Sequence, residues 1–310
     1  MSFENLVSEV GEILTPSGNK INVVITSIRK QVKEYVAQNR IKSLVLGVSG
    51  GLDSASVAAL CQEKYTGVPL IGISIPMSST NAHKEQAQWV GKEFCTTFEE
   101  FDGWDKNGLF EILEKTDGLA VAAGFAQDSF PKPLLQGNLK ARLRMITLYD
   151  LARKTNGLVL STDNLSESQM GFWTICGDVG DFGPIQNVGK GFELPVIARA
   201  LGVREDIITQ APSDGLMVTK DNTDEAQLGA SYKEVDTVMS IYLGLLDTVS
   251  DYNKRILNPK ATNAYKATLF KLMAEDPVAA KKISNVISRY ENSVFKRRGT
   301  INLTREQIGI

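Results

Sequence analysis

A serine- and glycine-rich segment, Ser49-Gly50-Gly51-Leu52-Asp53-Ser54, carries groups suited to holding phosphate. The first N–H groups of a helix lack partners within the helix, and the helix dipole places positive charge beside them, so anions bind at helix N-termini. Gly50 and Gly51 let the backbone approach an anion without a Cβ in the way. Asp53 repels bare phosphate, so we expect it to hold a divalent cation that bridges phosphate oxygens. The segment predicts a site for a metal-bound polyphosphate.

A second polar segment, Thr162-Asp163-Asn164-Leu165-Ser166-Glu167, follows the apolar run 158–161. One interpretation is structural: Thr162 or Asp163 would be a good helix N-cap, with Ser166 or Glu167 completing a capping box. The other interpretation is functional: Thr162 contacts ATP and Glu167 shares a cation with Asp53. Two carboxylates from neighbouring strand ends suit Mg²⁺, which keeps several of its waters. The residues by themselves leave both interpretations open.

Two further segments are candidates for ligand contact. Gly137–Met145 is predicted to be helical and carries Lys140, Arg142 and Arg144. Residues two apart diverge on a helix, so at least one of these cations must face away from a ligand that the others hold. Spacing alone favours a solvated basic face. The glycine- and aspartate-rich segment 171–183 is predicted to be an irregular loop, of the kind that forms mobile lids in enzymes.

His83 is the only histidine, and the cysteines Cys61, Cys95 and Cys176 are far apart in the sequence. One histidine excludes a His-based triad or a His-rich metal site within one chain. The predicted helical context of His83 favours a surface or capping role. The cysteines have neither zinc-site spacing nor a disulfide framework, which fits a reducing cytoplasm.

Composition narrows the classes of partner. The chain has 310 residues, a net charge of −2 and 43% hydrophobic residues, which is ordinary for a globular protein. A pI of about 5.7 argues against nucleic acid as the main partner, since such domains usually carry a strong basic patch. No apolar run reaches membrane-spanning length, and the N-terminus lacks the basic region and apolar run of a signal peptide. We therefore expect a cytoplasmic protein that binds neither membranes nor nucleic acid.

Buried strands and amphipathic helices must position these side chains. The continuous apolar run 44–48, directly before the phosphate segment, is typical of a strand buried on both faces of a parallel sheet. The runs 68–75 and 158–161 predict two more such strands, and apolar residues at steps of three and four predict a helix over 20–38. The fold class expected is α/β: a Rossmann-like open twisted parallel sheet with helices on both faces and a helical C-terminal part. We expect one domain over 1–310, with N-terminal helices in 1–40 and a helical C-terminal extension over 230–310.

Taken in order, these motifs resemble the ammonia-dependent NAD synthetases, which belong to the N-type ATP pyrophosphatases. The first motif, Ser49–Ser54, is shared by several pyrophosphatase families, whereas Gly137–Met145 and Thr162–Glu167 are more particular to this one. The similarity covers about Ile21 to Arg298. It includes Gly177-Asp178, Asp181, Lys190, Pro212-Ser213, Thr223-Asp224-Glu225, Leu228-Gly229 and Lys296-Arg297.

The resemblance implies a role for each matched residue. Mg²⁺ would be held by Asp53 and Glu167, and Asp53 and Lys190 would serve catalysis. The residues implied to bind ATP are Gly47, Ser49, Gly50, Gly51, Asp53, Ser54, Thr162, Lys190 and Ser213. Those implied to bind the acceptor, nicotinate adenine dinucleotide (deamido-NAD), are Asn138, Arg142, Arg144, Asp178, Asp181 and Lys296. The family is homodimeric, and each acceptor site takes residues from both chains.

The implied reaction consumes ATP, deamido-NAD and ammonia. The acceptor carboxylate attacks the α-phosphate of ATP, and ammonia then displaces AMP from the acyl-adenylate to give NAD. The chain departs from the family at Ile175 and Phe295, where lysine and histidine are usual, and the end of the chain after Arg298 also differs. Two alternatives stay open: another N-type ATP pyrophosphatase that amidates or thiolates a different nucleotide, or a module that binds ATP without turnover.

Overall fold

The computed structural model describes residues 1–77, 80–104, 106–124, 132–213, 223–244 and 259–299. The strands of the sheet are β1 (Ser43–Gly47), β2 (Leu70–Ser74), β3 (Thr97–Glu100) and β4 (Gly157–Val159). The helices of the first half are α1 (Phe3–Leu14), α2 (Asn19–Gln38), α3 (Leu52–Leu60), α4 (Glu63–Thr66), α5 (Asn81–Phe94), α6 (Lys106–Ala122) and α7 (Lys132–Thr155). Those of the second half are α8 (Leu165–Met170), α9 (Glu193–Ala200), α10 (Glu205–Thr209), α11 (Asp224–Leu228), α12 (Tyr232–Tyr242), α14 (Pro259–Glu275), α15 (Pro277–Asn292) and α16 (Val294–Arg297).

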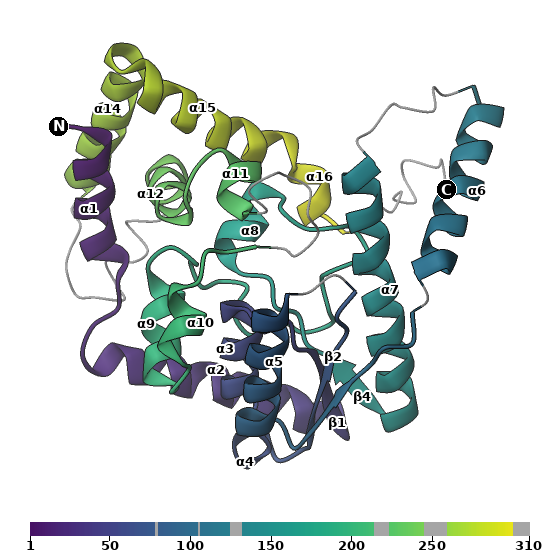
Figure 1. Ribbon diagram of the computed structural model, residues 1–310. Helices are drawn as coiled ribbons and strands as arrows, with labels where there is room; N and C mark the ends of the chain where they lie inside the picture. The colour runs from purple at the N-terminus through teal and green to yellow at the C-terminus, as the bar shows by residue number, and fades with distance from the viewer. Residues whose placement is uncertain (78–79, 105, 125–131, 214–222, 245–258, 300–310) are drawn as a thin grey trace, which may run out of the picture.

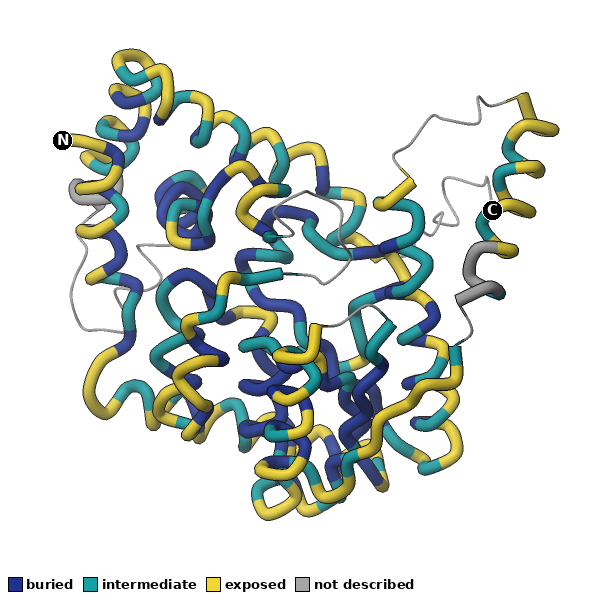
Figure 2. Tube along the Cα trace, in the orientation of Figure 1, coloured by how far each residue is buried: buried dark blue, intermediate teal, exposed yellow. Residues whose placement is uncertain are grey.

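The strands form one parallel sheet in the order β3-β2-β1-β4, and helices cover both of its faces (Figure 1). Along β1, Leu44 pairs with Leu70 of β2 and Ser43 pairs with Gly157 of β4. The interior of β1 is fully buried, as the apolar run predicted (Figure 2). The expected α/β class with a parallel sheet is confirmed.

Alternating residues of β1 feed two different cores, because successive side chains of a strand point to opposite faces. Leu44 and Leu46 belong to the larger core, which α2, α3, α5, α9 and α10 build on one face of the sheet. Val45 belongs to a smaller core on the other face, where Met145 and Leu148 of α7 pack against the strands. The carboxyl ends of the strands are thereby left as the edge on which a ligand can bind.

A third core lies away from the sheet and joins the two ends of the chain. Phe3 and Leu6 of α1 pack with residues of α8, α12, α14 and α15, including Met239 and Ile283. Figure 1 shows α1 beside α14 and α12, while α2 runs along the sheet half of the molecule. The two N-terminal helices therefore serve different cores, although they are neighbours in sequence.

The last strand is shorter than the apolar run 158–161 predicted. Its regular pairing with β1 ends at Val159, and Leu160 forms an isolated parallel bridge with Phe182. The Ser161 N–H donates to the carbonyl of Phe182 at 2.8 Å, so the chain changes its pairing partner there. That change turns the segment after Ser161 across the carboxyl ends of the strands.

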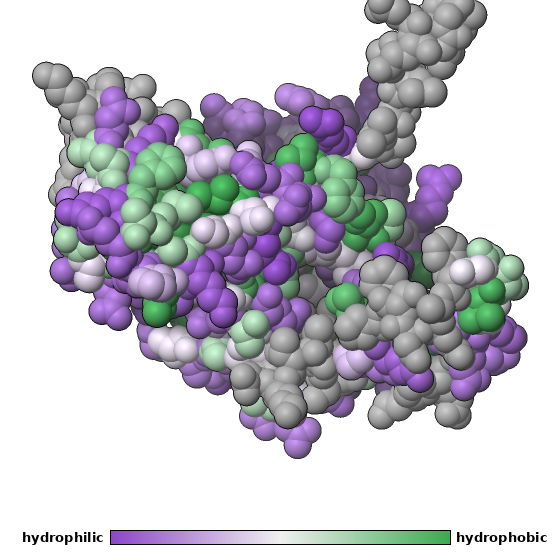
Figure 3. Space-filling view, turned by 90° about the horizontal axis from the view of Figure 1, so that it is seen from above, coloured by the Kyte–Doolittle hydropathy of each residue, from purple (hydrophilic) through white to green (hydrophobic). Residues whose placement is uncertain are grey.

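Viewed from above, the surface carries small groups of hydrophobic side chains separated by hydrophilic ones (Figure 3). Among the described helices, none combines the length and the hydropathy that a membrane span requires.

Candidate active site

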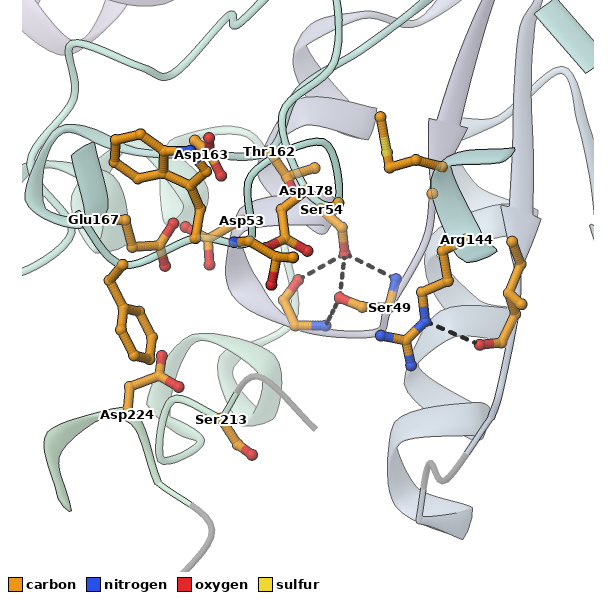
Figure 4. Close-up of a pocket in the computed structure, with 18 of the residues that line it drawn as sticks. Ser49, Asp53, Ser54, Arg144, Thr162, Asp163, Glu167, Asp178, Ser213 and Asp224 are labelled. Atoms are coloured by element: carbon orange, nitrogen blue, oxygen red, sulfur yellow. Dashed lines mark hydrogen bonds between the residues drawn. The ribbon is translucent and has the colours of Figure 1, made fainter. Parts of the chain in front are cut away.

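The phosphate segment forms the turn between β1 and α3, and its own side chains fix its shape. Ser54 Oγ donates to the Gly51 carbonyl at 3.1 Å and accepts the Ser49 N–H at 3.3 Å. The Gly51 N–H donates to Ser49 Oγ at 3.2 Å (Figure 4). Gly50 has a φ of +87°, and a Cβ there would lie 2.4 Å from the carbonyl oxygen of His83. Glycine is required by both the backbone conformation and the close approach of α5.

A pocket of about 510 Å³ opens beside this turn, within the size range of small-ligand sites. It is lined by most of the residues that the sequence predicted: Gly47, Ser49, Gly51, Asp53, Ser54, Asn138, Arg144, Thr162, Glu167, Asp178, Lys190, Ser213 and Lys296. The others, Gly50, Arg142 and Asp181, lie outside the described lining. Residues from both ends of the chain thus converge on the carboxyl edge of the sheet.

Lys190 lies at the centre of an acidic cluster in this pocket. Its Nζ is 2.9 Å from Asp53 Oδ2, 2.8 Å from Glu167 Oε1 and 3.6 Å from Asp224 Oδ2. The Tyr232 hydroxyl is 2.8 Å from Asp224 Oδ2 and 3.2 Å from Glu167 Oε1. The Lys190 side chain is only 7% exposed, so its charge is neutralised by these carboxylates rather than by water.

The cluster shifts the pKa values of its members. Burial alone lowers the pKa of the Lys190 ammonium, but Asp53, Glu167 and Asp224 outweigh burial and raise it. Burial raises the pKa of Glu167, and Lys190 opposes that shift. Asp163 also lines the pocket, and burial together with the charges of Glu167 and Asp178 raises its pKa to about 8. The pocket therefore gathers more acidic groups than Lys190 can neutralise.

The capping box expected for the Thr162–Glu167 segment is present, but its N-cap is Asn164 rather than Thr162 or Asp163. The Asn164 side chain accepts the Glu167 N–H, and the Glu167 side chain accepts the Asn164 N–H. The same Glu167 turns a carboxylate oxygen toward Lys190, and the Asn164 amide donates to Asp53 Oδ1 at 2.8 Å. The cap thus holds the two acidic side chains close together, as Figure 4 shows.

The donor set at this point fits a hard divalent cation. Asp53 and Glu167 present oxygens that both lie within 2.9 Å of one atom, the Lys190 nitrogen, so the two carboxylates converge. Oxygen ligands of this kind suit Mg²⁺, which completes its shell with waters and phosphate oxygens. Within the described ranges no group of three or more acidic, histidine or cysteine side chains forms a ready-made metal cage. Such a site would need oxygens from the nucleotide to be complete.

The loop that carries Lys190 is held by buried acceptors that the sequence did not bring to notice. The Lys190 N–H donates to Ser166 Oγ at 2.9 Å, and the Gly191 N–H donates to Asp236 Oδ2 at 2.8 Å. The Gly189 N–H donates to Glu193 at 2.6 Å. A Cβ on Gly191 would lie 2.6 Å from the Tyr232 carbonyl oxygen, so α12 approaches the loop closely. The signal that could have identified Asp236 in the sequence is an acidic residue among the apolar residues that α12 buries.

The predicted lid segment is tied to α7 and β4. Asp178 accepts the Thr174 N–H at 2.6 Å, and the Thr174 hydroxyl donates to Asn138 at 2.8 Å. Asp181 accepts the Tyr149 hydroxyl at 2.9 Å and the Val159 N–H at 3.2 Å, which places it beside β4. The contacts of Asp181 in one chain are therefore structural.

The cations of the helix α7 diverge, as the spacing predicted. Arg144 lines the pocket, and its Nε donates to the Ile75 carbonyl at 3.4 Å. Arg142 is exposed, and its Nε donates to the carbonyl of Ile175 at 3.2 Å. The Ile175 side chain itself is 45% exposed and lies outside the described lining.

Two cations of α16, Lys296 and Arg297, contact backbone carbonyl groups. Lys296 Nζ donates to the carbonyls of Gly171 at 2.7 Å and Trp173 at 2.6 Å. Arg297 donates to the carbonyls of Ser168 and Gln169 at the end of α8. These cations satisfy the free carbonyl groups of the helix that carries Glu167.

His83 is half-buried and lines the pocket, in place of the surface or capping role expected. Its Nε2 lies 2.6 Å from Nε2 of Gln210. Burial lowers the pKa of the imidazole. The backbone carbonyl of His83 lies against Gly50 and thereby limits the space beside the phosphate turn.

Comparison with known proteins was made on sequence and on structure. Residues 24–300 match the family model described as NAD synthase. The chain is 33% identical over 229 residues to the NH(3)-dependent NAD(+) synthetase of Methanocaldococcus jannaschii, which covers 73% of this chain and 83% of the relative. It is 35% identical over 210 residues to the enzyme of the same name from Finegoldia magna, covering 67% and 80%.

Two solved structures have the same fold. The NMN synthetase of Francisella tularensis superposes with a TM-score of 0.65 at 23% identity, covering 92% of this chain and 98% of that one. The NH3-dependent NAD synthetase of Campylobacter jejuni superposes with a TM-score of 0.59, also at 23% identity, covering 92% and 99%. At 23% sequence identity, the likeness to these structures concerns the fold alone.

Proposed function

The chain belongs to the NAD synthase family, and from this premise we propose that it is an ammonia-dependent NAD synthetase. It uses ATP to activate the carboxylate of deamido-NAD and replaces AMP by ammonia, giving NAD, AMP and pyrophosphate. The observation that carries the proposal for this pocket is the convergence of Asp53, Glu167 and Lys190 beside a preformed phosphate turn.

ATP binds with its phosphates on the Ser49–Ser54 turn and the N-terminus of α3. Ser49, Gly51 and Ser54 line the pocket, and the turn needs little reorganisation when the anion arrives, because it is already fixed by its own hydrogen bonds. Thr162 and Ser213, which also line the pocket, contact the rest of the nucleotide.

Asp53 and Glu167 would hold Mg²⁺, which neutralises phosphate charge when it is bound. Lys190 lies between these two carboxylates, so its ammonium is within reach of the same phosphates. As the acceptor oxygen attacks the α-phosphate, negative charge builds on that phosphate and on departing pyrophosphate. Lys190 and the N-terminus of α3 stabilise that developing negative charge electrostatically.

The acceptor contacts Asn138, Arg144, Asp178 and Lys296, which also line the pocket. Ammonia attacks the acyl-adenylate directly, and the reaction needs no covalent enzyme nucleophile. The described cysteines are free thiols, which fits a reducing compartment, and we infer a cytoplasmic enzyme.

We also infer a homodimer. Leu119 of α6 is 71% exposed, Ile146 of α7 is 57% exposed and Tyr149 of α7 is 41% exposed. Apolar side chains exposed on two adjacent helices suit contact with a second copy of the chain. Arg142 and Asp181, which lie outside the pocket lining of one chain, would then be available to an acceptor shared between protomers.

The deciding experiment is an acceptor panel. The protein is mixed with ATP, Mg²⁺ and ammonium together with deamido-NAD, nicotinate mononucleotide, xanthosine monophosphate or no acceptor, and products are identified by mass spectrometry. We expect NAD, AMP and pyrophosphate with deamido-NAD. Formation of ADP, or amidation of the mononucleotide with deamido-NAD untouched, would contradict the proposal.

A further inference from the structure

A half-buried arginine, Arg289 on α15, lines the pocket and has no role in the site described so far. It comes from the C-terminal helical part and lies close enough to Lys296 of α16 for its charge to lower the pKa of that lysine. Arg289 therefore lines the pocket from α15, whereas the Ser49–Ser54 turn lines it from the junction of β1 and α3.

The hydrogen bonds of Arg289 leave most of its donors unused. Its NH1 donates to the Gln227 carbonyl at 3.2 Å, at the end of α11. Its Nε is buried without a hydrogen-bond partner. A guanidinium has five N–H donors in a fixed planar arrangement, so capping α11 does not explain this side chain. Asn285 already donates to the neighbouring Leu228 carbonyl.

The charge of Arg289 also lacks an anion. Among the residues that the structure describes, no carboxylate forms an ion pair with it, and burial lowers its pKa without an anionic group to oppose the shift. Burial and the charge of Arg289 lower the pKa of Lys296, whereas the charges of Asp178 and Asp163 oppose that shift. Two cations held near each other in a pocket are stabilised when an anion binds between or beside them.

We propose that Arg289 binds a phosphate of the acceptor nucleotide. The proposal rests on the proposed function, which supplies an acceptor whose pyrophosphate carries two negative charges. Planar guanidinium donors grip phosphate oxygens at two points, which a lysine cannot do. Arg289 thereby favours an acceptor with phosphate in this position and fixes its register relative to ATP.

The test compares Arg289→Gln and Arg289→Lys with Lys281→Gln. Lys281 is exposed on the same helix, so its variant makes the same change of net charge outside the pocket. Each protein is measured for the KM of deamido-NAD, the KM of ATP, kcat, the Tm and the equilibrium affinity for deamido-NAD. For Arg289→Gln we expect the deamido-NAD KM and Kd to rise about tenfold to hundredfold, the loss expected for one charge-assisted contact. The KM of ATP should stay within about twofold of that of the unaltered protein. The deamido-NAD KM of Arg289→Lys should lie between those of Arg289→Gln and the unaltered protein, and Lys281→Gln should change none of these values.

Three results would overturn the inference. They are an unchanged deamido-NAD affinity in Arg289→Gln, a rise confined to the KM of ATP, or a fall in Tm with both KM values unchanged. If Arg289→Gln fails to fold, Arg289→Lys keeps the charge and decides the question by the same ratio of KM values. NAD formation by the unaltered protein tests the proposed function separately, because the binding measurement reports on Arg289 whether or not product forms.

Discussion

Ser166 donates a hydrogen bond of 2.5 Å to the Asp236 carboxylate, and both side chains are buried. Ser166 belongs to α8 and Asp236 to α12, so the bond joins the helix that carries Glu167 to the C-terminal core. The same serine oxygen accepts the Lys190 N–H, and the same carboxylate accepts the Gly191 N–H. This pair is what holds the backbone of the Lys190 loop in place.

Asp236→Asn is expected to lower kcat for pyrophosphate formation about tenfold to hundredfold, with little change in the KM of deamido-NAD. An amide would turn N–H donors toward the Gly191 N–H or toward Ser166, and an unsatisfied buried donor costs about 1–3 kcal/mol. Ser166→Ala removes the link to Lys190 but leaves the bond to Gly191, so it should give a smaller loss. Asp150→Asn, at an exposed ion pair, is the control. Equal losses of Tm in both buried variants with kcat unchanged would refute a positioning role.

Lys190→Met is expected to abolish pyrophosphate release and to destabilise the fold by about 3–5 kcal/mol, because one buried and two largely buried carboxylates lose their cation. The loss should be larger at pH 8 than at pH 5. Burial already raises the pKa of Glu167, and loss of Lys190 removes the charge that opposes this shift, so the stability of the variant falls as pH rises. Urea denaturation at both pH values measures this. Lys282→Met, which breaks the more exposed pair with Glu234, should cost less than about 1 kcal/mol.

In the metal-free protein, stability should decrease as pH rises from about 4 to 8. Burial raises the pKa of Asp163 to about 8 and that of Glu193 to about 7. A carboxyl whose folded pKa is above its unfolded value stabilises the fold fully below the unfolded pKa, and that stabilisation is lost as pH rises to the folded pKa. Asp163→Asn should flatten the upper part of the profile of Tm against pH. A variant profile parallel to that of the unaltered protein would show that Asp163 ionises normally.

Asp53→Asn should lose activity far more than it loses stability. Asp53 lines the pocket and contacts Lys190 and Asn164, rather than the hydrophobic cores. Removing divalent cations with a chelator should stop ATP cleavage in the unaltered protein, and Mg²⁺ should restore it. The variant should need more Mg²⁺ or remain inactive. Circular dichroism and melting provide the comparison; a Tm change as severe as the loss of rate would mean that Asp53 is a structural cap.

Light scattering should give the mass of a dimer at micromolar concentration. Ile146→Glu places a charge on an exposed apolar position of α7 and should shift the equilibrium toward monomer and raise the KM of deamido-NAD. Val23→Glu, at a position on α2 that is 51% exposed, is the matched control. A monomer that is fully active at nanomolar concentration would rule out the shared acceptor site.

The local sequence determined the sheet and the phosphate turn. Every residue of 44–46 is apolar and buried, and glycines at 50 and 51 permit the turn, so strand, turn and helix follow from neighbouring residues alone. The helix predicted over 20–38 is α2, Asn19–Gln38, because a period of three to four apolar residues defines a face whatever packs against it. Asp53 and Glu167 come after parallel strands, whose carboxyl ends meet at one edge of the sheet, so their placement at that edge also follows from the sequence.

The tertiary structure alone decided which charges meet. Lys190 lies between Asp53 and Glu167, which are 137 and 23 positions earlier in the chain. Local patterns specify backbone conformation and which face is buried, but the partner of a buried charge depends on how distant elements pack. The same is true of the C-terminal cations: packing brings Arg297 to the end of α8 and places Arg289 in the pocket lining. A charged side chain that leaves water must find a counter-charge or a carbonyl, and only the folded chain, together with its ligand, supplies one.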